Sequence, residues 1–233
     1  MPRKTYFALP LLLVFLFLAA VPNRCLAQEG ASFGLKLSPT LVFGRQFIDD
    51  KKVDSMDVGS RLGFNGGFQA HYGFTDNFGV YSGVMISLRN LNDFIDPSLG
   101  PEGQQLNMTF VEIPAALQLT SFDLGGGWYL KGLFGATIDI NTGATFKGEE
   151  TLRYGDRIQP LGASFLAGAG VEYDLFGAGY LDIGLSYHHG LFNVLKTGYQ
   201  TSDDERVGPI SEPFADRELR LSFVALDIGF IFK

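Results

Sequence analysis

The amino-acid sequence predicts an all-β protein, an eight-stranded antiparallel up-and-down transmembrane β-barrel. Three observations lead to this fold class. Apolar and small or polar side chains alternate with a period of two residues in eight segments, as they do in strands that separate two environments. The connections between these segments are alternately long and short. The chain contains 30 glycines and 22 phenylalanines while only 18% of its residues are charged, an unusual combination for a soluble domain because glycine weakens strands.

The first expected element is a cleaved secretory signal peptide over residues 1–27. Arg3 and Lys4 precede an apolar run over 7–21, and small residues precede the expected cleavage site after Ala27. An uncleaved anchor is the alternative, but this run is shorter than the roughly 20 residues that a spanning helix needs. The rest of the chain, residues 28–233, is expected to form one outer-membrane β-barrel domain.

The only cysteine, Cys25, lies within this signal, and the three residues before it do not fit a lipoprotein processing site. The mature chain is therefore expected to contain neither disulfides nor thiolate metal sites. Loss of the signal also removes three cations and takes the formal net charge from −7 to −10. Because phosphate binding needs clustered cations, we expect no nucleic-acid partner, and no motif points to a cofactor.

Eight strands are expected after the signal, each close to the roughly 9 to 11 residues of a tilted membrane strand. They cover residues 33–43, 62–74, 78–88, 111–121, 128–140, 161–173, 180–189 and 224–232. The long connections are 44–61, 89–110, 141–160 and 190–223, and the short ones are 75–77, 122–127 and 174–179. Outer-membrane barrels have short periplasmic turns and longer extracellular loops, so the long connections are expected to be extracellular.

The alternation gives the strands two faces of different character. One face is apolar, with Leu37, Phe68, Val84, Phe134 and Ile183 among its members, and carries no charge. The other face combines many glycines with charges of both signs. A soluble, lipocalin-like barrel would turn the apolar face inward and expose a polar face rich in lysine, threonine and glutamate. Small residues beside a few large polar ones instead suit the crowded lumen of an eight-stranded membrane barrel, so the apolar face is expected to contact lipid.

Pro114 falls on the lumen face of its strand and cannot donate a ladder hydrogen bond. The sequence therefore predicts a local bulge at this residue. If the strand phase nevertheless continues, Phe110 and Met108 are expected to point into the lumen.

The candidate site is a polar network in the lumen. It comprises Lys36, Arg89, Glu112, Lys131, Glu172, Asp182, His188 and Asp227. Buried charges are tolerated only when they are paired and hydrogen-bonded, so the cations are expected to pair with the carboxylates. A lumen filled in this way is not expected to pass solutes quickly, unlike the aqueous channels of barrels with about 16 strands.

Two segments resemble a known family. FVEIPAALQL (residues 110–119) is similar to the EIP strand of the PorT-like outer-membrane β-barrel proteins, and LSYHHGLFNVL (residues 185–195) resembles their late strand, which ends in a Gly-Leu-x-Asn turn. The end of the signal in Ala-Gln fits as well. The resemblance extends over most of the mature chain as a pattern of eight strands and implies a bacterial outer-membrane barrel. The type IX secretion role of the founding group is not carried over from these two motifs.

An outer-membrane lipid hydrolase is the enzymatic alternative, because Ser186 and His188 share one strand face and Glu172 lies on the neighbouring strand. This phase points both residues into a filled lumen, whereas a lipid hydrolase needs its nucleophile to be reachable from the bilayer. Adjacent His188 and His189 point to opposite faces, so they do not predict a metal site. The sequence thus favours a non-enzymatic barrel.

The expected location is the bacterial outer membrane, with its lipid bilayer as the first partner. The expected role is anchoring, recognition or assembly at the cell surface through the extracellular loops, with an extracellular or secretion-apparatus protein as a second partner. A narrow, porin-like solute pore and a component of a protein secretion apparatus remain alternatives.

Overall fold

The computed structural model describes residues 30–48, 51–94, 104–147, 151–153, 158–195 and 217–232. The signal peptide expected at residues 1–27 lies outside the described residues. Within them, no helix is both long and apolar enough to cross a membrane.

All strand pairings among the described residues are antiparallel. The strands are β1 (Gly30–Ile48), β2 (Lys51–Gly73), β3 (Phe78–Phe94), β4 (Gln104–Thr120), β5 (Trp128–Lys147), β6 (Thr151–Arg153), β7 (Leu161–Asp174), β8 (Gly179–Gly190) and β9 (Arg217–Phe232). Their order in the sheet is β4-β3-β2-β1-β9-β8-β7-β5-β6, and an additional pairing of β4 with β5 closes the sheet. Because β6 contributes only three residues paired with β5, the closed wall has eight strands, as predicted.

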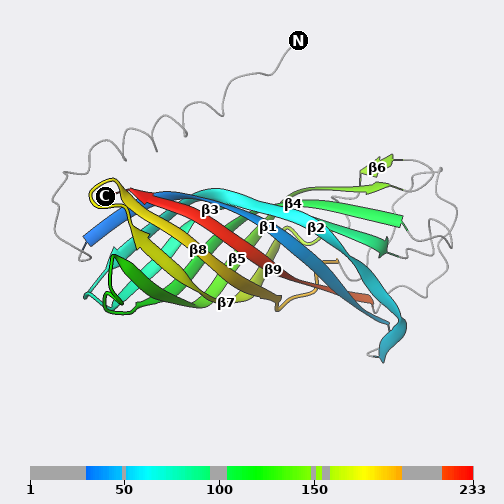
Figure 1. The fold of residues 1–233 in the computed structure, drawn as a ribbon. Coiled ribbons are helices and arrows are strands. Elements are labelled where there is room, and N and C mark those ends of the chain that lie inside the picture. Colours follow the sequence, from blue (N-terminus) through cyan, green and yellow to red (C-terminus); the bar gives the residue numbers. More distant parts are fainter. Residues whose placement is uncertain are drawn as a thin grey trace, which may run out of the picture.

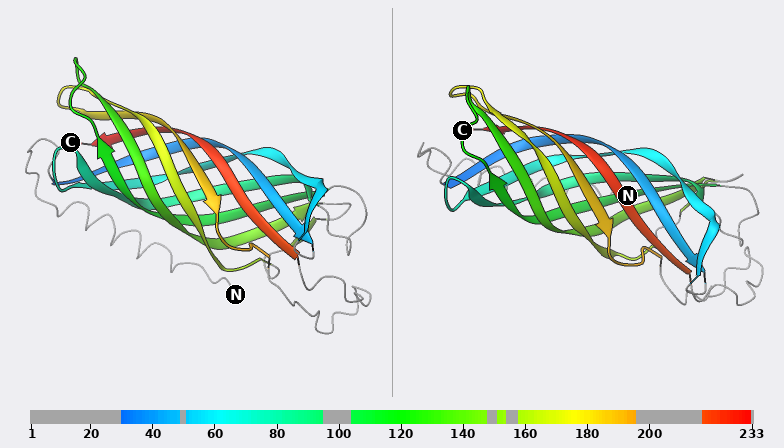
Figure 2. Two further views of the ribbon diagram at one scale, coloured as in Figure 1. Left: turned by 90° about the horizontal axis from the view of Figure 1, so that it is seen from below. Right: turned by 60° about the horizontal axis from the view of Figure 1, so that its bottom comes forward.

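The barrel is long and its strands wind obliquely around it (Figure 1). Three short turns, at residues 74–77, 121–127 and 175–178, lie at one end, which we call the short-turn end. The opposite end, which we call the loop end, holds the far ends of β1 with β2, β3 with β4, and β5. Figure 2 shows that the strands keep this tilt around the whole wall. Closure leaves no free sheet edge around the middle of the barrel, as a strand-built membrane span requires.

The short turn predicted at residues 75–77 is confirmed. The chain turns between β2 and β3 where Thr75 Oγ1 accepts hydrogen bonds from the backbone N–H groups of Asn77 and Phe78. Phe74 N donates to Phe78 O across the same turn at 2.9 Å. Short polar side chains at this point satisfy turn donors that no strand can reach.

The strands are longer at the loop end than the sequence predicts. The connection expected at 44–61 is largely strand, since β1 continues to Ile48 and β2 begins at Lys51. Two irregularities, between Val42 and Gly44 and between Arg45 and Phe47, shift the register of this pair. Such register shifts interrupt the period-two pattern of the sequence while backbone pairing continues.

The bulge predicted at Pro114 is wrong. The pairing of β3 with β4 stops at Ser82 with Ala115, resumes at Met85 with Glu112, and keeps one register across the gap. The missing donor therefore removes local pairs without adding a residue to the strand. The Ser82 hydroxyl donates to the Pro114 carbonyl at 2.9 Å. The register shift of β4 lies instead between Thr109 and Phe110, opposite β5.

The two faces have the predicted orientation. Large apolar residues on the outer face are exposed, including Leu37, Phe68, Val84, Phe134 and Ile183. Side chains of the other face are buried inside the wall, and Met108 and Phe110 are among them, as continuity of the strand phase predicts. The outside of the barrel is therefore apolar and its interior is mixed.

Two glycines show how the lumen accommodates its large polar residues. A Cβ added to Gly34 on β1 or to Gly229 on β9 would lie 2.9 Å from Nε2 of Gln69. The Gln69 side chain thus occupies space that these glycines leave free. Narrow barrels fill their interior by such pairing of small and large residues.

Candidate functional site

The lumen contains three clusters of charged and polar side chains, stacked along the barrel from the short-turn end. We name them after their cations. The Lys131 cluster comprises Lys131, Glu172, Asp182, Gln118 and His71. The Lys36 cluster comprises Lys36, Asp227, Ser38 and Tyr81. The Arg89 cluster comprises Arg89, Glu112, Asp139, His188, Phe110 and Phe223.

The Lys131 cluster lies nearest to the short-turn end. The Lys131 ammonium group forms an ion pair with Asp182 and lies 3.7 Å from Oε1 of Glu172. Gln118 Nε2 donates to the same Glu172 oxygen at 3.2 Å, and the Gln118 carbonyl oxygen contacts the His71 ring. Five strands therefore meet here through side chains, because β2, β4, β5, β7 and β8 each contribute one residue.

The Lys36 cluster occupies the middle of the lumen. Lys36 Nζ lies 3.4 Å from Oδ1 of Asp227, to which the Ser38 hydroxyl donates at 2.6 Å. The same ammonium group stands 5.3 Å from the ring centroid of Tyr81. Tyr81 packs with Met85, Ala116, Leu133 and Leu166 in a buried apolar group. These bulky side chains fill the lumen around the ion pair.

The Arg89 cluster is the most highly connected of the three. The Arg89 guanidinium group donates to Glu112 Oε2 and to Asp139 Oδ2, both at 2.9 Å. Its central carbon lies 4.6 Å from the centroid of the Phe110 ring and 4.8 Å from that of Phe223. Such a cation between two rings gains cation–π attraction in addition to its ion pairs. The guanidinium group is thus held from all sides across the lumen.

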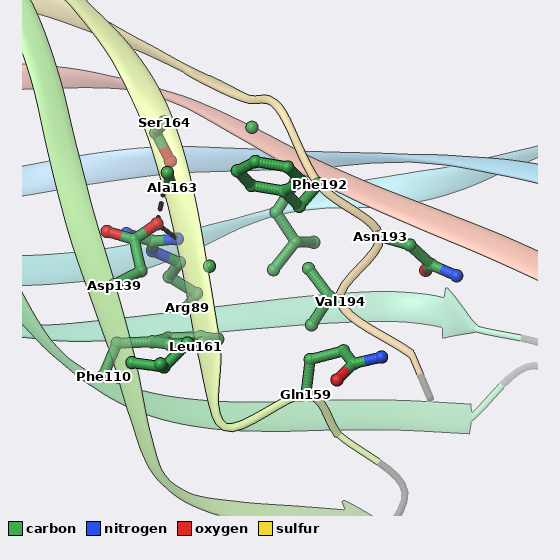
Figure 3. Close-up of a pocket in the computed structure, with 13 residues that line it drawn as sticks. Arg89, Phe110, Asp139, Gln159, Leu161, Ala163, Ser164, Phe192, Asn193 and Val194 are labelled. Carbon is green, nitrogen blue, oxygen red and sulfur yellow. Dashed lines mark hydrogen bonds and ion pairs between the residues drawn. The ribbon is translucent and has the colours of Figure 1, made fainter. Parts of the chain in front are cut away.

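Neighbouring residues satisfy the carboxylates of this cluster. Asn65 Nδ2 donates to Glu112 at 3.2 Å, and the Ser164 hydroxyl donates to Asp139 at 2.8 Å (Figure 3). His188 Nδ1 lies 3.3 Å from the other Glu112 oxygen, and its ring stacks on Phe223 at 4.1 Å. Buried ionic groups are stable only with this degree of satisfaction.

An apolar cluster covers the Arg89 cluster toward the loop end. It contains twelve buried residues: Val42, Leu91, Leu106, Met108, Phe110, Ala144, Ile158, Leu195, Leu219, Leu221, Phe223 and Ala225. Sequence reasoning missed this loop-end apolar cluster, because most of its members lie beyond the ends of the predicted strands. The strand extensions therefore enclose a hydrophobic core of their own.

Residues 191–195 contribute to this cover. After β8 ends at Gly190, Asn193 Oδ1 accepts hydrogen bonds from the backbone N–H groups of Leu195 at 2.9 Å and Leu219 at 2.8 Å. Val194 N donates to Leu219 O at 2.8 Å. The Gly-Leu-x-Asn segment is thus a turn whose asparagine ties β8 to β9, and it places Leu195 in the apolar cluster.

The eight residues proposed from the sequence are all buried in the lumen, but they do not form one network. Glu112 meets Arg89 and His188, whereas Glu172 and Asp182 meet Lys131, and Asp227 meets Lys36. Asp139 was not among the eight, although its position on the lumen face was visible in the alternation. Its pairing with Arg89 depends on the stagger between β3 and β5, which the sequence does not display.

The geometry around Ser186 and His188 does not resemble a catalytic triad. His188 contacts Glu112, whereas Glu172 belongs to the Lys131 cluster. Within the described ranges, no group of three or more histidine, cysteine, aspartate or glutamate residues is arranged to hold a metal ion.

Among the comparisons with known proteins, the match to a family model identifies the family of this chain. A family model described as the outer membrane protein beta-barrel domain matches residues 26–196. Comparison with curated protein sequences gave no match. Among solved structures, the chain is similar to Ail, the attachment invasion locus protein of Yersinia pestis, at 16% identity and a TM-score of 0.40, covering 88% of this chain and 100% of Ail. It is also similar to the outer membrane protein OprG of Pseudomonas aeruginosa, at 12% identity and a TM-score of 0.47, covering 88% of this chain and 98% of OprG.

Proposed function

Because the chain belongs to the family of outer membrane protein beta-barrel domains and lies in the bacterial outer membrane, we propose that it is a non-conducting scaffold that presents its loop end to a protein partner at the cell surface. Its role is then anchoring, recognition or assembly rather than transport. The barrel supplies the membrane anchor and the loop end supplies the contact.

The observation that carries this proposal is the closure of the lumen by the Arg89 cluster. Arg89 and Glu112 are only 2% and 1% exposed, and they join β3, β4 and β5 across the interior. The loop-end apolar cluster then covers them with twelve buried residues. An aqueous path would have to pass both layers, and rearranging a paired, buried cation costs several kcal/mol.

The extended strands support a role for the loop end. Ile48 of β1 still pairs with Arg217 of β9, and Phe94 of β3 pairs with Gln104 of β4. Pairing this far along the strands, together with an apolar core, gives the described part of this end a folded structure. A folded platform loses little conformational entropy when a partner binds.

Two sequence segments favour a finer placement among the PorT-like proteins. The EIP segment contributes Glu112 to the Arg89 cluster, and the Gly-Leu-x-Asn segment forms the turn that holds Leu195. Both segments thus contribute to closure of the lumen, and the proposed scaffold role depends on this closure. The proposal assigns no catalytic step to Ser186 or His188.

In-cell photo-cross-linking tests the scaffold directly. A photoreactive side chain is placed at exposed Ser60 or Thr142 near the loop end, and at Asp76 or Asp123 in the short turns as matched controls. A partner at the surface should give an adduct of one defined mass from the loop-end positions only. Adducts from the short turns alone would instead indicate a periplasmic partner and would contradict the proposal.

A further inference from the structure

The wall of the barrel is interrupted between β7 and the segment that follows β8. Regular pairing of β7 with β8 ends at Ser164 with Gly190. Beyond this pair, Leu191 N donates to Ala163 O at 2.9 Å, and the next backbone bond between the two segments runs from Gln159 N to Val194 O at 2.7 Å. Residues 161–163 and 191–193 therefore face one another with a single backbone hydrogen bond in the described structure. We call this interruption the β7–β8 gap.

A pocket lies at the β7–β8 gap (Figure 3). Arg89, Asp139 and Ser164 form its floor, on the lumen side. Its sides are apolar and include Phe110, Val194 and Leu221. The cavity volume is about 20 Å³, which is room for one water-sized group such as a hydroxyl.

The mouth of the pocket opens on the apolar outside of the barrel. Leu161 and Phe192, which line the pocket, are 62% and 60% exposed, and neighbouring Leu191 is exposed as well. Leu161 pairs with Ile140 of β5, which in turn pairs with Val111 of β4 on the outer face. The lip is thus continuous with the lipid-facing surface at its loop-end edge, while the loop-end apolar cluster covers the lumen above. An occupant therefore enters from the lipid.

The floor determines which head group fits. Arg89 already lies 2.9 Å from one oxygen each of Glu112 and Asp139, so these three groups together carry one excess negative charge. A second anion would meet two carboxylates in a buried site, which disfavours it. An uncharged hydroxyl can instead exchange hydrogen bonds with Ser164 and with backbone groups of the gap, which lipid tails leave unsatisfied.

We propose that the β7–β8 gap is a binding site for an uncharged, single-chain amphiphile from the outer leaflet, with its hydroxyl head beside Ser164 and Asp139 and its chain leaving past Phe192. The site goes beyond the scaffold role, and its occupancy does not require the lumen to conduct.

Fluorescence quenching by 12-bromododecanol tests the site. The only tryptophan, Trp128, is replaced by Phe, and Phe192→Trp then places a fluorophore at the lip. The bromine at the chain end should quench this tryptophan saturably, and unlabelled dodecanol should restore the signal. 12-Bromododecanoate at a pH where it is ionised should bind at least about tenfold more weakly. Phe134→Trp, on the outer face, should report only non-saturable quenching from probe dissolved in the bilayer.

A variant with a larger side chain inside the pocket gives the decisive test of the site. A Cβ at Gly162 would lie 3.7 Å from the Asp139 Cβ, an ordinary van der Waals contact, and the methyl groups of Gly162→Val should occupy part of the pocket. It should abolish the saturable phase, while Gly143→Val, whose Cβ would meet nothing within 4 Å, should retain it. Circular dichroism confirms that both variants are folded. Non-saturable quenching at Phe192→Trp, or an unchanged saturable phase in Gly162→Val, would overturn the site, and equal binding of the carboxylate would overturn the uncharged head.

Discussion

Arg89 illustrates how a single residue can link several strands inside this barrel. Its side chain has two carboxylates and two aromatic rings around it, and it is nearly inaccessible to solvent. Removing one carboxylate leaves the cation paired with the other but disturbs a network that joins three strands. The charged groups of this network stabilise one another, so their contributions to the free energy of unfolding are expected to be non-additive.

A double-mutant cycle measures this coupling. Glu112→Ala should destabilise the barrel by about 1.5 to 3 kcal/mol, because Arg89 loses one charged hydrogen-bond partner but keeps Asp139. The same change should cost less in an Arg89→Ala background, where this pair is already absent, and the coupling energy should exceed about 0.5 kcal/mol in urea unfolding from vesicles. Glu112→Ala with Lys131→Ala is the matched control, because Lys131 belongs to another cluster and the two changes should be additive. Additivity in both cycles would contradict the assigned pairing.

The outer face gives a second prediction at the level of residues. Val84 and Ile183 lie midway along β3 and β8 with 53% and 40% of their surfaces exposed. Each replacement by arginine should therefore cost about 2 to 4 kcal/mol of folding free energy in vesicles, because a charge near the bilayer centre loses its hydration. Asp76→Arg in the first short turn is the control and should cost much less. Small losses for both lipid-facing variants would indicate that this face does not contact lipid.

At the scale of the elements, alternation predicted which residues of each strand face inward, but not where strands end. Lys36, Asp182 and Asp227 could be placed on the inner face because strand side chains alternate regardless of their partners. The continuation of β1 to Ile48 and of β2 from Lys51 could not be predicted, because register shifts break the alternation there. The same limit hid the loop-end apolar cluster.

The sequence also could not predict which charged residues of the lumen pair with one another. Arg89 and Asp139 are 50 residues apart in the chain, and they meet only because β3 and β5 are both neighbours of β4 at a particular stagger. Closure of a barrel sets this stagger through its shear, which is a property of all strands together. Alternation within one strand therefore predicts a residue's side of the wall but not its partner across the lumen.

Cysteine labelling tests the assignment of the two ends. Cys25 is the only cysteine of the sequence, so thiols introduced into a Cys25→Ser background report without interference. Ser60→Cys and Thr142→Cys, near the loop end, should react with a membrane-impermeant maleimide on intact cells. Asp76→Cys and Asp123→Cys, in the short turns, should react only after the outer membrane is opened. The reverse pattern would invert the barrel in the membrane.

At the scale of the whole molecule, the barrel combines an apolar exterior, a filled interior and an extended loop end. Three ionic clusters and one apolar cluster follow each other along the lumen. Eight strands leave an interior just wide enough for side chains, so closure by side chains is the expected state of so narrow a barrel. A closed barrel can anchor the protein in the membrane and present its loop end to a partner, whereas a solute pore needs a continuous aqueous path.

Single-channel recording in a planar bilayer tests closure of the lumen most directly. The native protein should insert without steady conductance. The double variant Arg89→Ala with Phe110→Ala, which removes the cation and one ring from the Arg89 cluster, should show frequent openings if it remains folded. A steady open conductance in the native protein, unchanged in this variant, would show that ions pass through a hydrated lumen and would contradict the scaffold in favour of a narrow pore.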